Sequence, residues 1–148
     1  MSNFFETVDP TIFRSYIFWS AVLGLKMLVM SILTGMKRQA KKAFANPEDA
    51  PKGVKPVTND PDVERIRRAH LNDLENILPF FVIAFLYLFT NPSVLVATNL
   101  FRAVAVARIV HTLVYAVFVI PQPARGLAWM VGYFSTGYMA VTTILAFL

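Results

Sequence analysis

Cysteine is absent from this chain of 148 residues, and histidine occurs only twice, as His70 and His111. The missing thiol excludes disulfides, a cysteine nucleophile and cysteine-ligated metals. No carboxylates have the spacing of metal ligands, so we expect no metal. Charge is also scarce, because 16% of the residues are charged and 56% are hydrophobic. That hydrophobic share exceeds the ~45–50% of soluble domains and argues against a soluble helical protein.

The apolar residues fall into four segments, the first of which is too long for the apolar region of a cleaved signal. A polar loop follows the first segment, and the turns "TNPS" and "PQPAR" separate the last three. Short connections favour antiparallel neighbours. We therefore predict an all-α integral membrane protein, a bundle of four transmembrane helices in one domain, 1–148. The predicted helices cover about 12–36, 62–90, 94–120 and 126–148, with the polar loop over about 37–61.

Basic residues are concentrated on one side of this predicted bundle. Nine of the 14 Lys and Arg residues lie between Lys37 and Arg68. Positive residues mark the cytosolic side of a membrane protein, so we expect the polar loop in the cytosol and both termini in the lumen. Orientation thus accounts for most of the net charge of +5, with attraction of an anionic lipid or ligand as the alternative. We predict no nucleic-acid partner.

Polar side chains enter the second and third segments at helical spacing. The purely apolar part of the second segment runs only from Ile77 to about Phe89, too short to span ~30 Å at ~1.5 Å per residue. The helix must therefore extend back through charged residues. Each of the two helices then carries a polar face, the first with Arg68, Asn72 and Glu75 and the second with Arg108, His111 and Tyr115.

In an antiparallel hairpin these two faces would meet at three levels, with Glu75 opposite Arg108, Asn72 opposite His111 and Arg68 opposite Tyr115. The polar groups either hold the helices together or line a ligand cavity. Cations outnumber acids, which favours a ligand with several carboxylates and one amine. Arginine forks would bind the carboxylates, and Glu75 would bind the amine. Lys26 is expected to pair with Asp73 or Glu75.

The fourth segment combines a basic start with small and aromatic residues. Arg125 follows "PQPA" at the predicted helix N-terminus, which favours an anion. It would there stabilise a thiolate or oxyanion, or else reach a lipid phosphate. Trp129 and Tyr133 either line an apolar substrate pocket or serve as packing and interfacial anchors. Small residues at four-residue spacing favour close helix packing in lipid, namely Gly132, Thr136 and Ala140.

Three stretches resemble the MAPEG family, the membrane-associated proteins in eicosanoid and glutathione metabolism. They are "KKAFANPEDA" (41–50), "DPDVERIRRAHLNDLENILPF" (60–80) and "ARIVHTLVYAVFVIPQPAR" (107–125). The resemblance covers nearly the whole chain. Within the family it is strongest to microsomal glutathione transferases of the first type and next to microsomal prostaglandin E synthases.

The resemblance implies a homotrimer in the endoplasmic reticulum membrane, and also the mitochondrial outer membrane, with glutathione as cosubstrate bound between subunits near the cytosolic face. It implies transfer of the glutathione thiolate to lipophilic electrophiles, a detoxification reaction, and peroxidase activity toward lipid hydroperoxides. Arg125 would be the catalytic residue. The glutathione-binding positions carried over by motif are Arg38, Arg68, Asn72, Glu75, His111, Tyr115 and Arg125.

Two other functions remain open. One is isomerisation of the prostaglandin E synthase type, against which Leu71 and Gly126 count because that branch has Arg and Ser there. The other is a non-catalytic lipid-binding scaffold, against which the retained polar residues count. Arg125 follows Tyr115 by ten residues where relatives have nine, so its placement depends on the intervening loop. Asp49 either closes over the site or is simply solvated.

Overall fold

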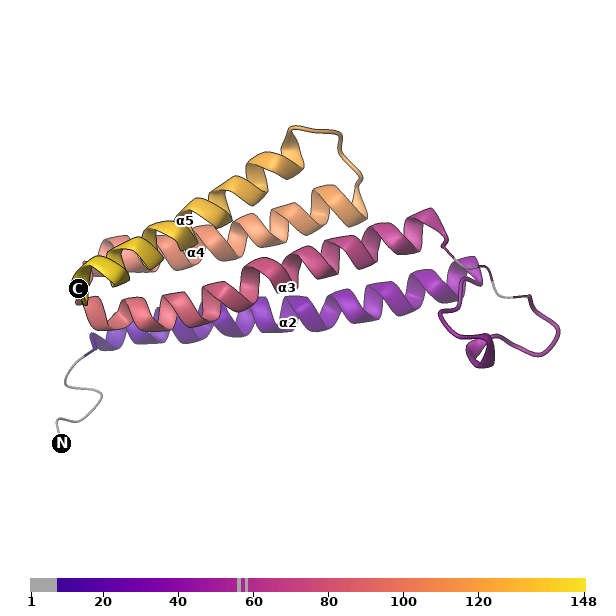
Figure 1. Cartoon of the computed structure of the whole chain (residues 1–148), viewed down its shortest axis with the longest axis horizontal. Coiled ribbons are helices and arrows are strands. Elements are labelled where there is room, and N and C mark those ends of the chain that lie inside the picture. Colours follow the sequence, from indigo (N-terminus) through magenta and orange to yellow (C-terminus); the bar gives the residue numbers. More distant parts are fainter. Residues whose placement is uncertain (1–7, 56, 58) are drawn as a thin grey trace.

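A computed structural model describes residues 8–55, 57 and 59–148, and the regular elements within these residues are helices (Figure 1). Two expected helices differ in extent. The first runs over 10–41 rather than about 12–36, and the third ends before 120. The elements are α2 (Pro10–Lys41), η1 (Pro47–Asp49), α3 (Pro61–Tyr87), η2 (Leu88–Thr90), α4 (Val94–Thr112), the π-helical turn η3 (Leu113–Val117) and α5 (Ala124–Ala146).

The two longest helices begin at Asp-Pro pairs. Asp9 Oδ1 accepts hydrogen bonds from the N–H groups of Thr11 and Ile12, at 2.7 and 3.2 Å, and Pro10 opens the helix. Asp60 and Pro61 open α3 in the same way. A carboxylate N-cap satisfies free backbone donors, and proline is already set for the first helical position. These pairs place the starts of α2 and α3.

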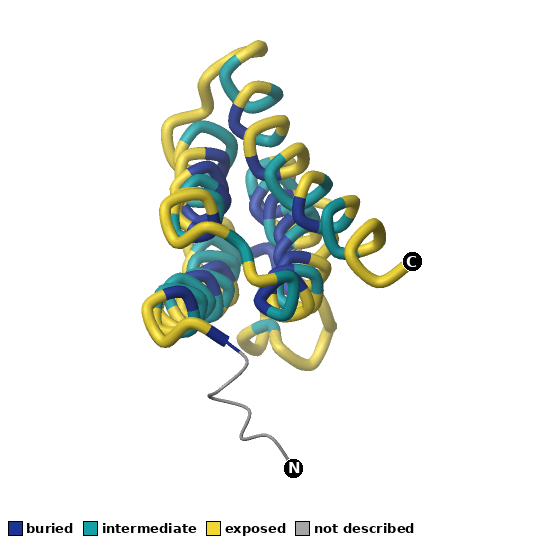
Figure 2. The backbone as a smooth tube through the Cα atoms, turned by 90° about the vertical axis from the view of Figure 1, so that its left-hand side faces the viewer, coloured by how far each residue is buried: buried dark blue, intermediate teal, exposed yellow. Residues whose placement is uncertain are grey.

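The order of the helices around the bundle differs from the expected hairpin. α2 packs against α3 and α4, and α5 packs against the same two helices, so α3 and α4 lie diagonally and contact each other little (Figure 2). Large side chains fill the space between α3 and α4, since the ring centroids of Phe80 and Phe101 lie 6.2 Å apart. Two small residues on α4, Ala97 and Ala105, are fully buried. Their size lets α2 and α5 pack closely against α4.

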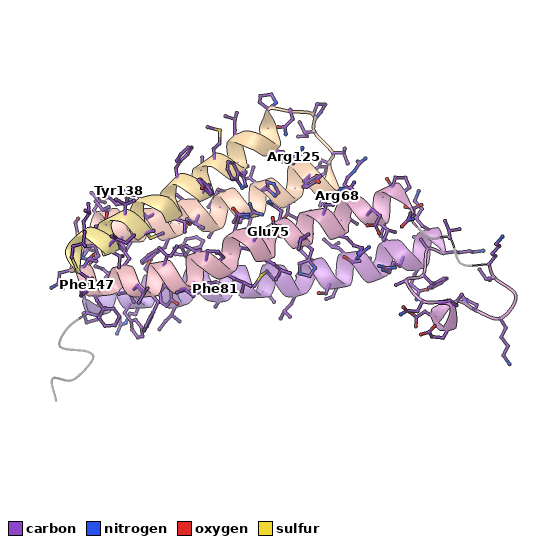
Figure 3. All side chains as sticks on the ribbon, viewed as in Figure 1. Arg68, Glu75, Phe81, Arg125, Tyr138 and Phe147 are labelled. Atoms are coloured by element: carbon purple, nitrogen blue, oxygen red, sulfur yellow. The ribbon has the colours of Figure 1, made fainter. Side chains whose placement is uncertain are left out.

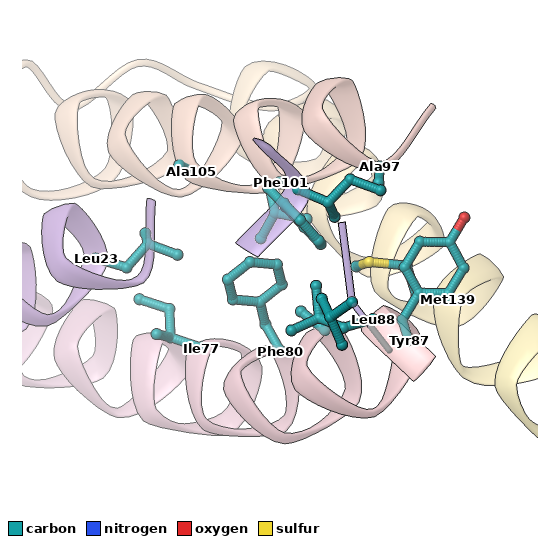
Figure 4. Close-up of a cluster of buried hydrophobic side chains, with 13 residues drawn as sticks. Leu23, Ile77, Phe80, Tyr87, Leu88, Ala97, Phe101, Ala105 and Met139 are labelled. Carbon is teal, nitrogen blue, oxygen red and sulfur yellow. The ribbon is translucent and has the colours of Figure 1, made fainter. Parts of the chain in front are cut away.

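Apolar packing is concentrated where the four helices converge, next to the C-terminus (Figure 4). Leu23, Ile77, Phe80, Phe101 and Met139 are fully buried there, and they come from all four helices. The outer surface carries many exposed large apolar side chains instead. In the described residues, three helical segments are long and apolar enough to cross a membrane, namely Pro10–Lys41, Pro61–Thr90 and Val94–Val117.

Candidate functional site

A charged cluster joins three helices in the middle of the bundle. The Asp73 side chain of α3 is completely buried. It accepts a hydrogen bond from Lys26 of α2 and ion-pairs with Arg108 of α4, whose Nη2 lies 2.6 Å from Asp73 Oδ1. Thr112 adds a weaker contact at 3.5 Å. The expected acid partner of Lys26 is thus Asp73, and Glu75 stays free for other contacts.

Arg108 does not face Glu75 as the hairpin arrangement predicts. Its guanidinium turns to Asp73 and to Asn72, whose Oδ1 lies 2.9 Å from Arg108 Nη2. The side chain is only 1% exposed, and its Nη1 has no hydrogen-bond partner among the described residues. The predicted pairing fails because α3 and α4 are diagonal neighbours, so only long side chains bridge them.

Beside this cluster lies a cavity of about 430 Å³ between α3, α4 and α5, which we call the polar cavity. Figure 3 shows Arg68 and Arg125 near the end of the bundle where α4 and α5 are joined, with Glu75 closer to its middle. Six of the seven candidate ligand residues lie here. The lining is formed by Arg68, Leu71, Asn72, Glu75, His111, Tyr115, Gln122, Arg125, Gly126 and Trp129.

Arg125 is held by an aromatic contact at the start of α5. Its guanidinium carbon lies 4.3 Å from the centre of the Tyr115 ring, close enough for a cation–π interaction. Tyr115 in turn meets the His111 ring edge to face at 5.6 Å. The guanidinium of Arg125, which follows the loop of 118–123, therefore reaches the polar cavity.

Gln122 is a cavity residue that the sequence interpretation missed. Its Oε1 accepts a hydrogen bond from the Gly126 N–H at 3.1 Å, which satisfies one free donor of the first turn of α5. A carboxamide four residues before a glycine at a helix start is the signal that could have identified it. Gln122 also lines a neighbouring hollow together with Arg68, Tyr115 and Arg125, so it borders both hollows.

The charges in the polar cavity are available to a ligand. Within the described residues, the side chains of Arg68 and Glu75 form no ion pair and no hydrogen bond, and both residues are exposed. Two cations, Arg68 and Arg125, thus share the cavity with one acid. The arrangement can bind carboxylates through arginine forks and an amine through Glu75.

Arg38 and Asp49 lie outside the polar cavity. Arg38 lines a separate hollow of about 220 Å³ beside the polar loop, and its Nη1 donates to the Ala43 carbonyl at 3.3 Å. Asp49 is exposed in that loop and accepts a hydrogen bond from Asn46 Nδ2 at 3.0 Å. Neither side chain lines the polar cavity within the single chain.

Aromatic residues of α5 continue from the polar cavity to a second, smaller hollow along the same helix. The Trp129 and Tyr133 rings stack at 4.6 Å with an interplanar angle of 23°. Trp129 lines the polar cavity, whereas Tyr133 lines a smaller hollow of about 270 Å³ with Pro79 and Ile83. Glu75 borders both hollows, so an apolar recess adjoins the charged site.

Comparison with known proteins agrees with this architecture. The model of the MAPEG family matches residues 16–145. Microsomal glutathione S-transferase 1 of Mus musculus is 42% identical over 146 residues, covering 95% of this chain and 94% of the relative. The same enzyme of Homo sapiens is 40% identical with the same coverage. Prostaglandin E synthase of Bos taurus is 39% identical over 141 residues, covering 94% of this chain and 92% of the relative.

These matches extend over nearly the full chain, and they include the helices that line the polar cavity. The family is one of membrane proteins, in keeping with the three helical segments that are apolar enough to cross a bilayer. By this similarity the chain belongs to the MAPEG family.

Proposed function

We propose that this protein is a membrane-bound glutathione transferase that conjugates the glutathione thiolate to lipophilic electrophiles and also reduces lipid hydroperoxides. The observation that carries the proposal is the position of Arg125. Its guanidinium lies on the Tyr115 ring at the start of α5, inside a cavity that also holds a second arginine and one free carboxylate.

The charges of the polar cavity match those of glutathione, which has two carboxylates, one amine and a thiol. Arg68 and Arg125 supply cations and Glu75 supplies the acid that an ammonium group needs. The volume of about 430 Å³ falls within the ~300–1,000 Å³ of small-molecule sites. His111, Tyr115 and Asn72 add polar groups along the same wall. Binding in this cavity would hold the thiol in a defined position.

Arg125 is proposed to favour the thiolate over the thiol. An arginine beside free backbone N–H groups at a helix start stabilises a sulfur anion, and the effect is stronger away from bulk water. In conjugation, the thiolate sulfur forms a bond to an electrophilic carbon, and the leaving group departs with the electron pair. In peroxide reduction, sulfur attacks the O–O bond and releases an alcohol, and a second glutathione then yields the disulfide and water.

The trimer and its location belong to this proposal. Arg38 lies outside the polar cavity of its own chain, so a neighbouring copy is the proposed source of this arginine in a homotrimer with glutathione between subunits. Relatives named microsomal support the endoplasmic reticulum membrane, with the polar loop and the cavity on the cytosolic side, and we extend the proposal to the mitochondrial outer membrane. Asp49, on the same loop, is a candidate for closing over the bound ligand.

A second candidate function is isomerisation of a prostaglandin endoperoxide with glutathione, because a prostaglandin E synthase is 39% identical to this chain. The two departures from that branch both fall in the polar cavity. Leu71 leaves the cavity without a third arginine, and Gly126 leaves the first turn of α5 without a hydroxyl. These differences favour the transferase.

The test uses detergent-purified protein mixed with glutathione in a stopped-flow spectrometer that follows the ultraviolet absorption of the thiolate. A chlorinated nitrobenzene is added next, and conjugate formation is recorded. A thiolate signal followed by conjugate is the expected result. If a thiolate signal appears but no conjugate forms, the prostaglandin endoperoxide is supplied instead of the nitrobenzene. Its turnover would then establish the isomerase. Glutathione binding without either reaction would favour the non-catalytic lipid-binding scaffold.

A further inference from the structure

The apolar recess next to the polar cavity lies between facing sides of α3 and α5. It has a volume of about 270 Å³. Its lining includes Glu75, Asn76 and Pro79 of α3 together with Tyr133 and Thr136 of α5. Glu75 also lines the polar cavity, and in Figure 3 it lies between Arg125 and Phe81 along the bundle. The recess therefore continues the polar cavity toward the apolar core.

A proline leaves one backbone carbonyl of this recess without its helical partner. In an α-helix the N–H of each residue donates to the carbonyl four residues before it, and proline has no N–H. Pro79 lies inside α3, so the Glu75 carbonyl lacks its α-helical donor. The Leu78 N–H belongs to the Leu74 carbonyl in the same pattern. Because a helical carbonyl points toward the residue four positions ahead, this acceptor faces Pro79 and the recess.

Two side chains of the recess donate hydrogen bonds within their own helices. Thr136 Oγ1 donates to the Gly132 carbonyl at 2.9 Å, which uses its single hydroxyl hydrogen and leaves only lone pairs. The Asn76 NH₂ group donates to the Asn72 carbonyl at 2.7 Å and is thus turned back along α3. Asn76 keeps one N–H beside a free Oδ1, which is an acceptor.

Acceptors therefore dominate the polar atoms of the recess. The Glu75 carboxylate adds two oxygens that only accept. Among the described residues that line the recess none is basic, whereas the polar cavity holds Arg68 and Arg125. An ammonium group has three donors and no acceptor. The recess thus matches an ammonium group, as the polar cavity matches carboxylates.

We propose that this recess is the ammonium subsite of the ligand, and that Pro79 and Thr136 are specificity residues for it. The ammonium group binds the Glu75 carboxylate, the Glu75 carbonyl and Thr136 Oγ1, while the carboxylates stay with the two arginines of the polar cavity. The inference rests on the proposed function for the identity of the ligand, since glutathione has one amine. The recess then belongs to the glutathione site and is not the pocket of the lipophilic electrophile.

Glutaryl-cysteinylglycine tests the subsite, because it is glutathione without the amino group. Dissociation constants of both ligands are measured by equilibrium dialysis with the detergent-purified protein, and their ratio isolates the amine. Glutathione should bind the wild type at least about tenfold more tightly, the size of hydrogen bonds to a charged group. Equal constants would overturn the proposal.

A Thr136→Val variant removes one acceptor and keeps the shape of the side chain. Its matched control is Thr143→Val, because Thr143 makes the same kind of hydrogen bond, to the Met139 carbonyl at 2.8 Å, but does not line the recess. The ratio should fall about threefold or more in Thr136→Val and keep its wild-type value in Thr143→Val. Equal ratios in the two variants would show that the amine does not lie in this recess.

A Pro79→Ala variant gives the Glu75 carbonyl an N–H partner again. The ratio should fall here as well, because the carbonyl is then occupied within the helix. A change in the shape of α3 would weaken both ligands alike, so the ratio reports only the amine. An unchanged ratio would reject the role of Pro79.

Small probes test the recess without glutathione. Saturation-transfer NMR in a nonionic detergent compares butylammonium with butanol, which has the same chain but no charge. Butylammonium should give the stronger signal with the wild type and lose this advantage in Thr136→Val. The same advantage in both proteins would overturn the proposal. Failure of the wild type to bind glutathione would reject the proposed function, while the probes would still decide whether the recess takes an ammonium group.

Discussion

The two halves of the bundle differ in what fills them. In the half next to the C-terminus, all four helices converge on an apolar core that includes Phe80, Phe101 and Met139 (Figures 1 and 4). In the other half, α5 diverges from the other helices (Figure 1), and the interior holds Asp73, Arg108 and the polar cavity. One half is packed with side chains, and the other is left open for a ligand.

This contrast separates stability from chemistry. Aromatic and aliphatic packing joins the helices at one end, so the other end can keep charges that have no partner within the described chain, such as Arg68 and Glu75. The boundary is the cluster around Asp73, where the buried Arg108 and the largely buried Lys26 share one carboxylate. Buried ion pairs of this kind are costly to break, because a single substitution leaves an unpaired charge.

The largest effect is expected from Asp73→Leu, which removes the carboxylate at this boundary. Lys26 and Arg108 would both lose their only acid partner among the described residues. The free energy of unfolding should fall by about 3–5 kcal/mol, the usual cost of stranding a buried charge. Thermal unfolding in detergent, followed by circular dichroism, measures the change.

A triple variant supplies the control for that experiment. Replacing Lys26 and Arg108 by Met together with Asp73→Leu removes all three charges, and most of the lost stability should return. The same variant should bind glutathione poorly, since Asn72 and His111 lose their contact with Arg108. A triple variant as unstable as Asp73→Leu alone would contradict the view that unpaired charge causes the loss.

The next largest effect is expected from Arg125→Ala in the open half. Removing one group that stabilises a developing or formed anion costs about 100- to 1,000-fold in kcat. Glutathione binding should change much less, because other cavity residues retain the ligand. Conjugation rates and equilibrium dialysis separate the two. Arg102→Ala is the matched control, since the Arg102 side chain is exposed on α4 and, within the described residues, bonds only to Asn99. Equal losses of turnover and binding would reject the thiolate role.

A smaller effect is expected in the packed half, from Phe101→Leu. Phe101 is fully buried and contacts the rings of Phe80 and Tyr16. Shrinking it should lower the free energy of unfolding by about 1–1.5 kcal/mol, while the glutathione dissociation constant stays the same. Thermal unfolding and dialysis on the same preparation give both numbers. A clear loss of binding would mean that the two halves are not independent.

The smallest effect is expected from Gly126→Ala at the cavity wall. A methyl group there would come within 3.1 Å of Gln122 Oε1, the far end of a flexible side chain that can move aside. Stability should change by less than about 0.5 kcal/mol, and transferase activity should persist. A large loss would instead show that the Gln122–Gly126 hydrogen bond is essential to the start of α5.

Much of the fold could be predicted from the sequence, because helix formation depends on local pattern. Long apolar segments, prolines in the turns and polar residues at helical spacing indicate four helices and two polar faces. The Asp-Pro pairs at residues 9 and 60 are local signals of the same kind, and the predicted helices differ from the observed ones at several ends. The predicted partner of Lys26 included Asp73, which the structure bears out.

What the sequence by itself determined is which residues share a helical face, and hence that Arg68, Asn72 and Glu75 act together on α3. The tertiary structure decided which neighbour covers each face. It set α3 and α4 diagonally, turned Arg108 to Asp73 rather than Glu75, and left Arg38 outside the polar cavity. Helical periodicity is a property of one segment, whereas the order of four helices depends on how all their side chains pack at once.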